Sequence, residues 1–584
     1  MISDLSQIAD DAEYDVVVIG AGGAGMCAAL CAAIDGASVL LIERTEYVGG
    51  TTAYSAGSCW IPNTSHGAAV APNDSFEKAR DFLRRAVGGR TDDAVRVSFL
   101  ENGPKAVEYL EKHSMVKFRA RPYHPDYMSE HEGAALGGRA VEPLPFDGRQ
   151  LGPNLALVRP PVPEHTVLGG MMVDRDDVVK LLNMTKSFKS FKYAAKIVAR
   201  HAMDRLRHPR GTRLLMGNAL IARMLCSLLE RGVPILVNTK LESLVQEGGR
   251  IQGVMLSRAG VRRTVRARGG VILASGGYSR HPTRRKEMLP GIDIEWCSVA
   301  PGNTGEAQDL AVAAGARFGT GAFSNAVWAP VSLRKRADGS TAVFPHLFFD
   351  RGKPGMITVN QQGRRFLSEA TSYHMFAVEM QEANKVAPAI PAFLITDAAG
   401  LKRYGLGLVH PGGRGLAPFL ADGYLIRADS LAALARRLGF DPAVLEATIA
   451  RFNASAVTGV DEDFGRGSTP YQRLQGDAAY GGPNPCLGPI AQAPFYAVRL
   501  YPSDTGAATG LLTDVHARVL DTNKAPIAGL YACGNDMHSI TAGTYPGPGI
   551  TLGPALTFGY IAARHAVQRC KVQPSAAPDL RTQP

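Results

Sequence analysis

A tyrosine near the end of the chain stands in a segment whose backbone is both stiff and open. The stretch GTYPGPGITLGP runs from Gly543 to Pro554 and places Tyr545 among glycines and prolines. Proline fixes its own φ and restricts the residue before it, whereas glycine lets the backbone come close to another molecule. The segment can therefore present a phenol and a backbone N–H to a small ligand. An ordinary tight turn is the alternative that this stretch alone leaves open.

A second glycine-rich segment has the spacing of a dinucleotide-binding turn. Residues 14–43 read YDVVVIGAGGAGMCAALCAAIDGASVLLIE, which predicts a strand, a turn, an alanine-rich helix and a strand ending in Glu43. Gly20, Gly22 and Gly25 satisfy GxGxxG directly after the first strand. Such a turn lets a pyrophosphate face the helix N-terminus, and the carboxylate can accept a hydrogen bond from a ribose hydroxyl. We therefore expect a βαβ unit that binds NAD or FAD.

Three later segments favour FAD over NAD. Residues 43–58, ERTEYVGGTTAYSAGS, offer backbone N–H groups and hydroxyls where the longer arm of FAD would run. Residues 271–281, VILASGGYSRH, and residues 529–536, GLYACGND, are each a strand that runs into small residues. We expect these strands to join the same sheet and to end beside the cofactor.

Together these segments resemble the FAD-binding domain of the succinate dehydrogenase, fumarate reductase and ketosteroid dehydrogenase superfamily, over nearly the whole chain. The resemblance implies an α/β fold with a discontinuous Rossmann-like FAD-binding domain and an inserted α+β substrate domain. The implied FAD-binding parts are residues 1–287 and 500–584, and the implied substrate domain is residues 288–499. A basic excursion from the first part covers about residues 165–215. The expected cofactor-binding residues are Gly20, Gly22, Gly23, Ala24, Gly25, Glu43, Arg44, Gly50, Thr51, Thr52, Ser55, Ala274, Gly276, Gly277, Gly534, Asn535, Gly549, Thr551 and Leu552.

Two absences narrow the choice within this superfamily. The respiratory members attach FAD to a histidine in the loop after the acidic strand, and residues 43–58 contain none. We therefore expect FAD to be bound non-covalently. Dicarboxylate reductases need clustered histidines and arginines, whereas residues 543–554 carry an aromatic residue and prolines. An acidic substrate is accordingly disfavoured.

Three further segments resemble those of the 3-ketosteroid 1,2-desaturating dehydrogenases. They are the TYPGPG signature around Tyr545, GRRFLSEATSY ending at Tyr373, and HPDY ending at Tyr127. Desaturation beside a ketone requires a base for the α-proton and an acceptor for the β-hydride, which is the flavin. The resemblance assigns the ketone oxygen to the Tyr545 hydroxyl and the Gly549 N–H, the base to Tyr373, and a relay to Tyr127. Each tyrosine could instead be a half-buried aromatic residue whose hydroxyl is already hydrogen-bonded.

The leading interpretation is therefore an FAD enzyme that introduces an α,β double bond into a cyclic ketone, most simply the 1,2 bond of a 3-ketosteroid. Its partners would be the ketone and an external quinone or dye as electron acceptor. His124 stands where related enzymes tend to carry an apolar or aromatic residue, so a smaller cyclohexanone-type ketone stays an alternative. Two further alternatives are a fumarate- or enoate-type reductase and an electron-transfer subunit without a substrate pocket.

The formal charge of +11 is concentrated in one segment. Residues 186–213 carry nine Lys or Arg against one Asp, a local charge of +8. On a helical wheel apolar side chains share one face and lysines flank it. The segment could lie on an anionic membrane surface, or its apolar side could pack on its own domain. No nucleic-acid motif accompanies it. The residues on the predicted apolar face are Phe188, Phe191, Ala195, Val198, Ala202 and Leu206, and the flanking residues are Lys189, Lys192, Lys196 and Arg207.

The overall composition is that of a globular protein. The chain has 584 residues, of which 45% are hydrophobic and 20% charged, enough for more than one packed domain. Its eight cysteines show no CxxC or other metal-ligand spacing, so we expect no metal site. The N-terminal sequence MISDLSQIADDAEYD is acidic and lacks the features of a secretory signal, which predicts a cytoplasmic protein, with peripheral membrane contact through residues 186–213 left open.

Overall fold

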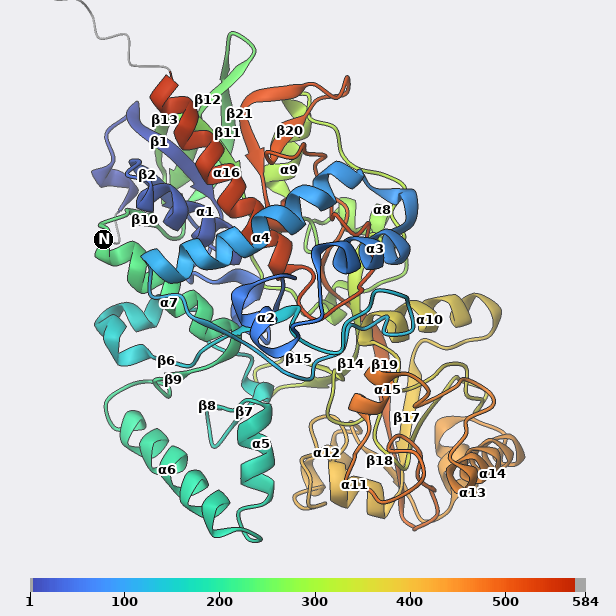
Figure 1. Ribbon diagram of the computed structural model, residues 1–584. Helices are drawn as coiled ribbons and strands as arrows, with labels where there is room; N and C mark the ends of the chain where they lie inside the picture. Colours follow the sequence, from blue (N-terminus) through green and yellow to red (C-terminus); the bar gives the residue numbers. More distant parts are fainter. Residues whose placement is uncertain (1–3, 573–584) are drawn as a thin grey trace, which may run out of the picture.

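Figure 1 shows a computed structural model of the chain, in which residues 4–572 are described. Residues 1–3 of the N-terminal segment and residues 573–584 of the last predicted FAD-binding part lie outside the described residues. The first βαβ unit forms as the sequence predicts. Strand β1 (Ala12–Ile19) leads through the glycine turn into helix α1 (Gly23–Ile34), and β2 (Val39–Ile42) returns parallel to β1. The β-branched residues of both strands are buried, as a strand covered on both faces requires.

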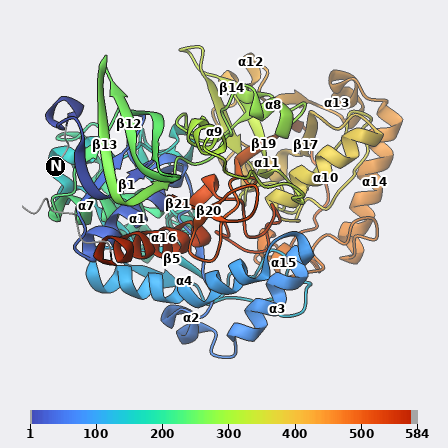
Figure 2. The ribbon, with the colours of Figure 1, turned by 90° about the horizontal axis from the view of Figure 1, so that it is seen from above.

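The larger sheet has eight strands in the order β10-β2-β1-β13-β12-β21-β20, with β11 paired to β12. Strand β13 lies between β1 and β21 and is parallel to both, so the end of the chain joins its beginning in one sheet. Helices α1, α7, α4 and α16 cover this region (Figure 1 and Figure 2). The bounds are β10 Ile235–Leu236, β11 Lys240–Glu247, β12 Arg250–Arg258, β13 Val261–Leu273, β20 Arg518–Leu520, β21 Pro526–Ala532, α4 Asp93–His113, α7 Met216–Glu230 and α16 Leu552–Val572.

We call the region of the larger sheet the first lobe. A second, antiparallel sheet of six strands lies beside it and forms the second lobe (Figure 2). Its order is β15-β14-β19-β17-β16, and β18 pairs with β19. The predicted boundaries at 287/288 and 499/500 stay predictions, and the second of them falls within β19. The bounds are β14 Ala326–Lys335, β15 Thr341–Pro345, β16 Met356–Val359, β17 Ala392–Thr396, β18 Ile426–Ala428, β19 Phe495–Ala507, α8 Arg284–Met288, α9 Glu306–Ala313, α10 Tyr373–Val386, α11 Ala398–Tyr404, α12 Ala417–Ala421, α13 Leu431–Leu438, α14 Pro442–Thr458 and α15 Pro470–Gln475.

The chain between these sheets forms smaller elements. A three-stranded sheet, β3-β5-β4, contacts helices α16, α7 and α2. The basic segment forms a hairpin of two helices, α5 and α6, at the lower left of Figure 1. No helix within residues 4–572 is long and apolar enough to cross a bilayer. The bounds are β3 Cys59–Trp60, β4 Phe118–Ala120, β5 Ala140–Pro143, β6 Phe146–Asp147, β7 Thr166–Val167, β8 Met171–Met172, β9 Arg213–Leu214, α2 Ser65–Val70, α3 Phe76–Val87, α5 Arg175–Leu182 and α6 Phe188–Arg205.

Candidate active site

The carboxyl ends of β1, β2, β13 and β21 meet at one edge of the larger sheet. Ile19 pairs with Ile42 on one side and with Leu273 on the other, and Leu273 pairs with Ala532. The loops that follow these four residues therefore start beside one another, although they lie up to about 500 residues apart in sequence. Ligands of open α/β sheets bind at such a carboxyl edge.

The turn after β1 is built to receive a phosphate. A Cβ at Gly22 would meet no atom within 4 Å, so this residue faces open space at the N-terminus of α1. The Gly23 N–H donates to the Thr52 hydroxyl at 3.2 Å, which joins the turn to the second glycine loop. The exposed N–H groups and the helix dipole favour an anion at this point.

Two buried carboxylates hold the loops around this turn. Glu43 accepts hydrogen bonds from the Ala21 N–H at 3.1 Å and from the Thr45 hydroxyl at 2.7 Å. Asp536, after β21, accepts from the Ser275 hydroxyl and the Gly277 N–H, both at 2.9 Å, after β13. These contacts fix the ends of strands that come from opposite ends of the chain.

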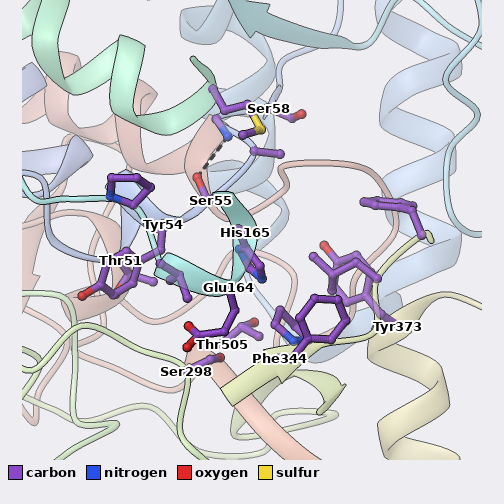
Figure 3. A pocket seen from close by; sticks show the side chains of 18 of the residues that line it. Thr51, Tyr54, Ser55, Ser58, Glu164, His165, Ser298, Phe344, Tyr373 and Thr505 are labelled. Carbon is purple, nitrogen blue, oxygen red and sulfur yellow. Dashed lines mark hydrogen bonds between the residues drawn. The ribbon is translucent and has the colours of Figure 1, made fainter. Parts of the chain in front are cut away.

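Almost every predicted cofactor-binding residue lines one continuous cavity of about 2860 Å³. This exceeds the volume of a typical small-molecule pocket, roughly 300–1,000 Å³, and leaves room for a dinucleotide together with a substrate. Gly25 and Gly277 do not line it. A Cβ at Gly25 would lie 1.8 Å from the Gly20 carbonyl oxygen, so this glycine serves the close packing of α1 on the turn. Ser55 and Ser58 both reach the cavity, whose wall runs on to Tyr373 (Figure 3).

The three predicted catalytic tyrosines form one cluster on the wall of this cavity. The ring centroids of Tyr127 and Tyr545 are 5.5 Å apart, those of Tyr127 and Tyr373 are 5.5 Å apart, and those of Tyr373 and Tyr545 are 5.3 Å apart. The Tyr373 hydroxyl interacts with the hydroxyls of both other tyrosines. The cluster is buried, and the Tyr545 hydroxyl also interacts with the Thr551 side chain. A phenol chain of this kind can pass a proton.

The backbone brings Tyr127 and Tyr545 together directly. The Tyr127 N–H donates to the Pro546 carbonyl at 2.7 Å, which attaches the PDY segment to the YPGPG segment. The neighbouring Asp126 carboxylate accepts from the Trp60 indole at 2.7 Å and from the Arg139 guanidinium at 2.8 Å. These buried contacts fix the register of both segments, since breaking such a pair would leave a charge without a partner.

Gly549 stands where no other residue fits. Its φ is +85°, and a Cβ there would lie 2.0 Å from the Ser58 carbonyl oxygen. The close approach of the two loops leaves the Gly549 N–H within interaction range of the Tyr545 hydroxyl. The phenol and the N–H predicted to share one ketone oxygen are therefore neighbours on the cavity wall.

Comparison with known proteins shows the family of the chain. The family described as FAD binding domain matches residues 15–552. The chain belongs to this flavoprotein family. It is 38% identical over 563 residues to the 3-oxosteroid 1-dehydrogenase of Mycolicibacterium smegmatis, covering 94% of this chain and 96% of the relative. It is 36% identical to the 4-oxocyclohex-2-ene-1-carboxylate 5-dehydrogenase of Sinomonas cyclohexanicum, covering 94% and 93% of the two chains.

Solved structures of flavoproteins share the fold. The 3-ketosteroid delta1-dehydrogenase of Sterolibacterium denitrificans, in complex with 1,4-androstadiene-3,17-dione, superimposes with a TM-score of 0.89 at 35% identity, covering 95% of this chain and 99% of that chain. A flavocytochrome c3 fumarate reductase has a TM-score of 0.62 at 20% identity, covering 96% and 79%, and shows the fold alone. FAD is the cofactor, and this flavoprotein is an oxidoreductase acting on CH–CH bonds. Its loop of residues 43–58 offers no histidine for covalent attachment.

Burial sets the pKa of each tyrosine in this flavoprotein. Desolvation raises the pKa of Tyr373 and Tyr127 well above the ordinary value of a tyrosine, and it raises the pKa of Tyr545 as well. Contact with Tyr373 and the charge of Arg351 act in the opposite direction on Tyr127. That contact and the charge of Arg351 therefore partly offset the effect of burial on the pKa of Tyr127.

Sequence reasoning missed two members of the site, Arg351 and Tyr471. Tyr471, from α15, packs against Tyr127 in a tilted arrangement with ring centroids 4.5 Å apart. Arg351 is buried near both rings, and its guanidinium donates to backbone carbonyls, among them those of Glu369 and Thr371 at 2.6 Å. Glu369 belongs to the GRRFLSEATSY segment, residues 363–373, and this segment was the only sequence feature that could have pointed to Arg351. Neither missed residue stands in a local pattern of its own.

Several features of the chain do not contribute to the cavity wall. The large aromatic residues Trp60, Phe323 and Trp328 do not line the cavity. The described cysteines are all free, and no metal-binding group is found within residues 4–572. Arg121, at the cavity wall, forms an ion pair with Glu142 at 2.7 Å, so it is not free to hold a dicarboxylate. Because the cavity extends past the cofactor loops to the tyrosines, an electron-transfer subunit without a substrate pocket does not describe this chain.

One substitution separates FAD binding from folding. We expect Gly22→Val to lose most bound FAD while the protein stays folded, because the new side chain enters open space at the phosphate turn and the φ of −77° suits valine. The test is the ratio of flavin to protein absorbance after purification, with circular dichroism as the fold readout. Gly89→Val is the matched control, since Gly89 also faces open space but lies outside the cavity. Full FAD content in Gly22→Val would remove this turn from the cofactor site.

Proposed function

We propose that the chain is an FAD-dependent dehydrogenase that introduces a double bond next to the ketone of a cyclic substrate, first of all the 1,2 bond of a 3-ketosteroid. One observation carries this proposal: three tyrosine hydroxyls and one backbone N–H gather on the cavity wall beyond the cofactor loops. The named activity of the 38% identical relative supports it.

In this mechanism the ketone oxygen accepts hydrogen bonds from the Tyr545 hydroxyl and the Gly549 N–H. Both donors stabilise the negative charge that grows on that oxygen as the α-proton leaves, and they make that proton more acidic. The Tyr373 oxygen takes the α-proton. When bound, FAD supplies the acceptor for the hydride that leaves the adjacent carbon. The substrate has then lost one proton and one hydride, and the carbon–carbon double bond is complete.

Tyr127 acts behind the base as a relay. Its hydroxyl interacts with that of Tyr373, so the proton can move onward as Tyr373 receives the substrate proton. Arg351 places a fixed positive charge near Tyr127 and Tyr471 and favours the ionised phenol that this relay needs. The guanidinium donates to backbone carbonyls, and its charge acts on both phenols and on the neighbouring Asp350 carboxylate.

The pH dependence of flavin reduction follows from the direction of the pKa shifts. A buried tyrosine with a pKa above about 10 is ionised in only a small fraction of molecules between roughly pH 7 and 9. That fraction increases about tenfold for each pH unit until the pH reaches the pKa. We therefore expect the rate constant for reduction by the ketone to rise throughout this range without a plateau. Anaerobic stopped-flow absorbance measures it, and a plateau that begins below about pH 8 would contradict a buried tyrosine base.

A smaller cyclic ketone that carries a carboxylate is the second candidate substrate. Lys353 lines the cavity and is partly buried, and the resulting desolvation lowers its pKa to about 8. Its ammonium donates to the carbonyls of Gln475 at 2.8 Å and Gly476 at 2.7 Å, and it forms no ion pair with any described residue. A substrate carboxylate could be held there. The 36% identical relative, which is named for a 4-oxocyclohexene carboxylate, gives this candidate independent support.

The partners and location belong to the same proposal. An external quinone or dye would reoxidise the flavin, and the basic segment 186–213 would bring the protein into peripheral contact with a membrane. A cytoplasmic location stays a prediction from the N-terminal sequence. An enoate or fumarate reductase remains the reverse-direction alternative, which requires that an unsaturated acid reoxidise the reduced flavin.

The deciding experiment is anaerobic bleaching of the flavin absorbance near 450 nm by 4-androstene-3,17-dione and, separately, by 4-oxocyclohexanecarboxylate. Bleaching by the steroid with formation of its 1,2-unsaturated product supports the first proposal. Bleaching by the carboxylate alone, with loss of that response in Lys353→Met, transfers the proposal to the smaller ketone. If neither ketone bleaches the flavin and fumarate reoxidises the reduced protein, the reductase alternative replaces both.

A further inference from the structure

The α5–α6 hairpin, residues 175–205, stands away from both lobes. In Figure 1 α5 descends from the body, the chain turns at residues 183–187, and α6 returns upward. The inner side of the hairpin is held by buried polar contacts. Asp177 of α5 accepts from the Tyr193 hydroxyl at 2.5 Å and from Arg213 at 2.8 Å, and Asp204 accepts from the Thr212 hydroxyl at 2.7 Å.

The outer side of the hairpin exposes apolar side chains. Phe188 is 82% exposed and Leu206 is 85% exposed, whereas Ala194, Ile197 and His201 lie on the buried side of α6. The predicted apolar face therefore does not pack on its own domain. Eight of the seventeen exposed large apolar side chains among the described residues fall between 168 and 206, so exposed apolar surface is concentrated on the hairpin and the segment before it, and we call these eight side chains the apolar patch. They are Leu168, Val179, Leu182, Met184, Phe188, Phe191, Met203 and Leu206.

Lysines flank this apolar patch, and their charge is not neutralised. Lys186, Lys189, Lys192 and Lys196 are exposed, and none forms an ion pair with a residue in the described part of the chain. Asp177 and Asp204 turn inward, toward Arg213 and Thr212, and Asp176 is paired with Arg119 and Arg121. An exposed apolar strip beside unneutralised lysines matches the surface of an anionic bilayer, where apolar side chains enter the acyl boundary and lysines meet the headgroups.

The same hairpin borders the active-site cavity. Val178, Val179 and Leu182 of α5, together with Asn183 and Lys186 at the turn, belong to the wall of the cavity that leads to the tyrosine cluster. Val179 and Leu182 are also half exposed to solvent. The mouth of the cavity and the apolar patch therefore share residues. A ligand that leaves the cavity at this end emerges beside the patch.

We propose that the α5–α6 hairpin docks on an anionic phospholipid bilayer and that an apolar cyclic ketone passes from the bilayer, along Val179 and Leu182, into the cavity. This inference rests on the proposed function for its substrate, and on the hairpin alone for its membrane contact. The docking uses apolar side chains of α6 for insertion and the lysines for attraction. The hairpin keeps the mouth at the lipid surface, where a steroid-sized ketone is concentrated.

Vesicle flotation tests the docking. Full-length protein with FAD bound is floated with phosphatidylcholine vesicles that contain phosphatidylglycerol, and with vesicles of phosphatidylcholine alone. We expect at least tenfold more protein on the anionic vesicles. Two triple variants should lose most of that binding: Lys189→Glu with Lys192→Glu and Lys196→Glu, and Phe188→Ser with Phe191→Ser and Leu206→Ser. None of these residues lines the cavity.

A matched control reverses three exposed cations on the other lobe, Arg414, Arg436 and Arg437, and should bind as the wild type does. Equal binding of the wild type and the lysine variant, or equal binding to both vesicle types, overturns the proposal. Sedimentation without vesicles tests whether a second copy of the chain, rather than a bilayer, contacts the apolar patch. If the wild type is a dimer that the serine variant dissociates and neither binds vesicles, the patch is an interface between two copies and the membrane proposal is wrong.

Turnover assays separate this inference from the proposed function. 4-Androstene-3,17-dione is presented either in cyclodextrin or embedded in anionic vesicles. We expect both triple variants to keep the wild-type rate with cyclodextrin and to fall at least fivefold with vesicles. Equal rates of variant and wild type in both forms overturn entry from the bilayer. If the wild type desaturates no ketone in either form, the proposed function fails, while flotation still decides whether the hairpin binds lipid.

Discussion

Replacing Tyr373 by phenylalanine is expected to slow flavin reduction by the cyclic ketone about 10²–10⁴-fold, the range for loss of a positioned general base, with little change in FAD content. Tyr373 begins α10, and its hydroxyl interacts with those of Tyr127 and Tyr545. No other described side chain is proposed as the base. The loss corresponds to about 3–5 kcal/mol of transition-state stabilisation. Anaerobic stopped-flow absorbance gives the rate constant of this step without interference from the electron acceptor.

A second readout identifies the step that is lost. If Tyr373 takes the α-proton, Tyr373→Phe should also stop exchange of that proton with D₂O in the presence of the ketone, as followed by NMR of the recovered substrate. Tyr109→Phe is the matched control, because the Tyr109 hydroxyl is hydrogen-bonded to Asp35 and lies outside the cavity. A Tyr373→Phe protein that reduces its flavin within threefold of the wild-type rate would show that another group is the base.

The cofactor half of the site could be predicted because its signals are local. The GxGxxG turn, the acid after β2 and the small residues after β13 and β21 each follow a strand, and parallel strands of one sheet bring their carboxyl ends together. Spacing alone could not distinguish glycines that face the cofactor, such as Gly22, from those that only allow close packing, such as Gly25. That distinction depends on what lies opposite each Cβ position.

The catalytic half depends on contacts that no local pattern contains. Tyr127 and Tyr545 are more than 400 residues apart, and backbone hydrogen bonds from Tyr127 and Met128 to the Pro546 carbonyl help to align them. Their motifs were recognisable only by resemblance to a family. Arg351 and Tyr471 had no such motif. The place of the buried arginine is defined by the backbone carbonyls of residues such as His346, Glu369 and Thr371, and backbone carbonyls leave no pattern of residue types in the sequence.

For the basic segment, the sequence predicted which residues share a helical face but not whether that face is buried. Helical periodicity placed Phe188, Phe191 and Leu206 on one face, and they do share an exposed face. The wheel left open whether this face packs on the protein. Packing follows Ala194, Ile197 and His201 instead, because buried hydrogen bonds that Asp177 and Asp204 accept hold the hairpin by its other side. The hydrogen bonds of Asp177 with Tyr193 and of Asp204 with Thr212 therefore determine which face of α6 is exposed to solvent.

Replacing Tyr545 by phenylalanine is expected to slow flavin reduction about 10²–10³-fold, the loss found when one oxyanion-hole donor is removed, or about 2.7–4 kcal/mol. Tyr545 is the donor that can be removed cleanly. Its partner Gly549 has a φ of +85° and no room for a Cβ, so any substitution there would rebuild the loop as well as the site. Phenylalanine keeps the stacking of residue 545 on Tyr127 and deletes only the hydroxyl.

Binding of an enolate mimic distinguishes the proposed oxygen donor, Tyr545, from the proposed base, Tyr373. A steroid with a phenolic ring A places a partly ionised oxygen where the enolate oxygen of the ketone would form. If Tyr545 stabilises that oxygen, Tyr545→Phe should weaken binding of the phenolic steroid by a factor close to its loss of rate, while Tyr373→Phe should change binding much less. Perturbation of the flavin spectrum measures both dissociation constants. Equal weakening in the two variants would mean that the cluster holds the oxygen as a unit, and the separate assignment of donor and base would then be wrong.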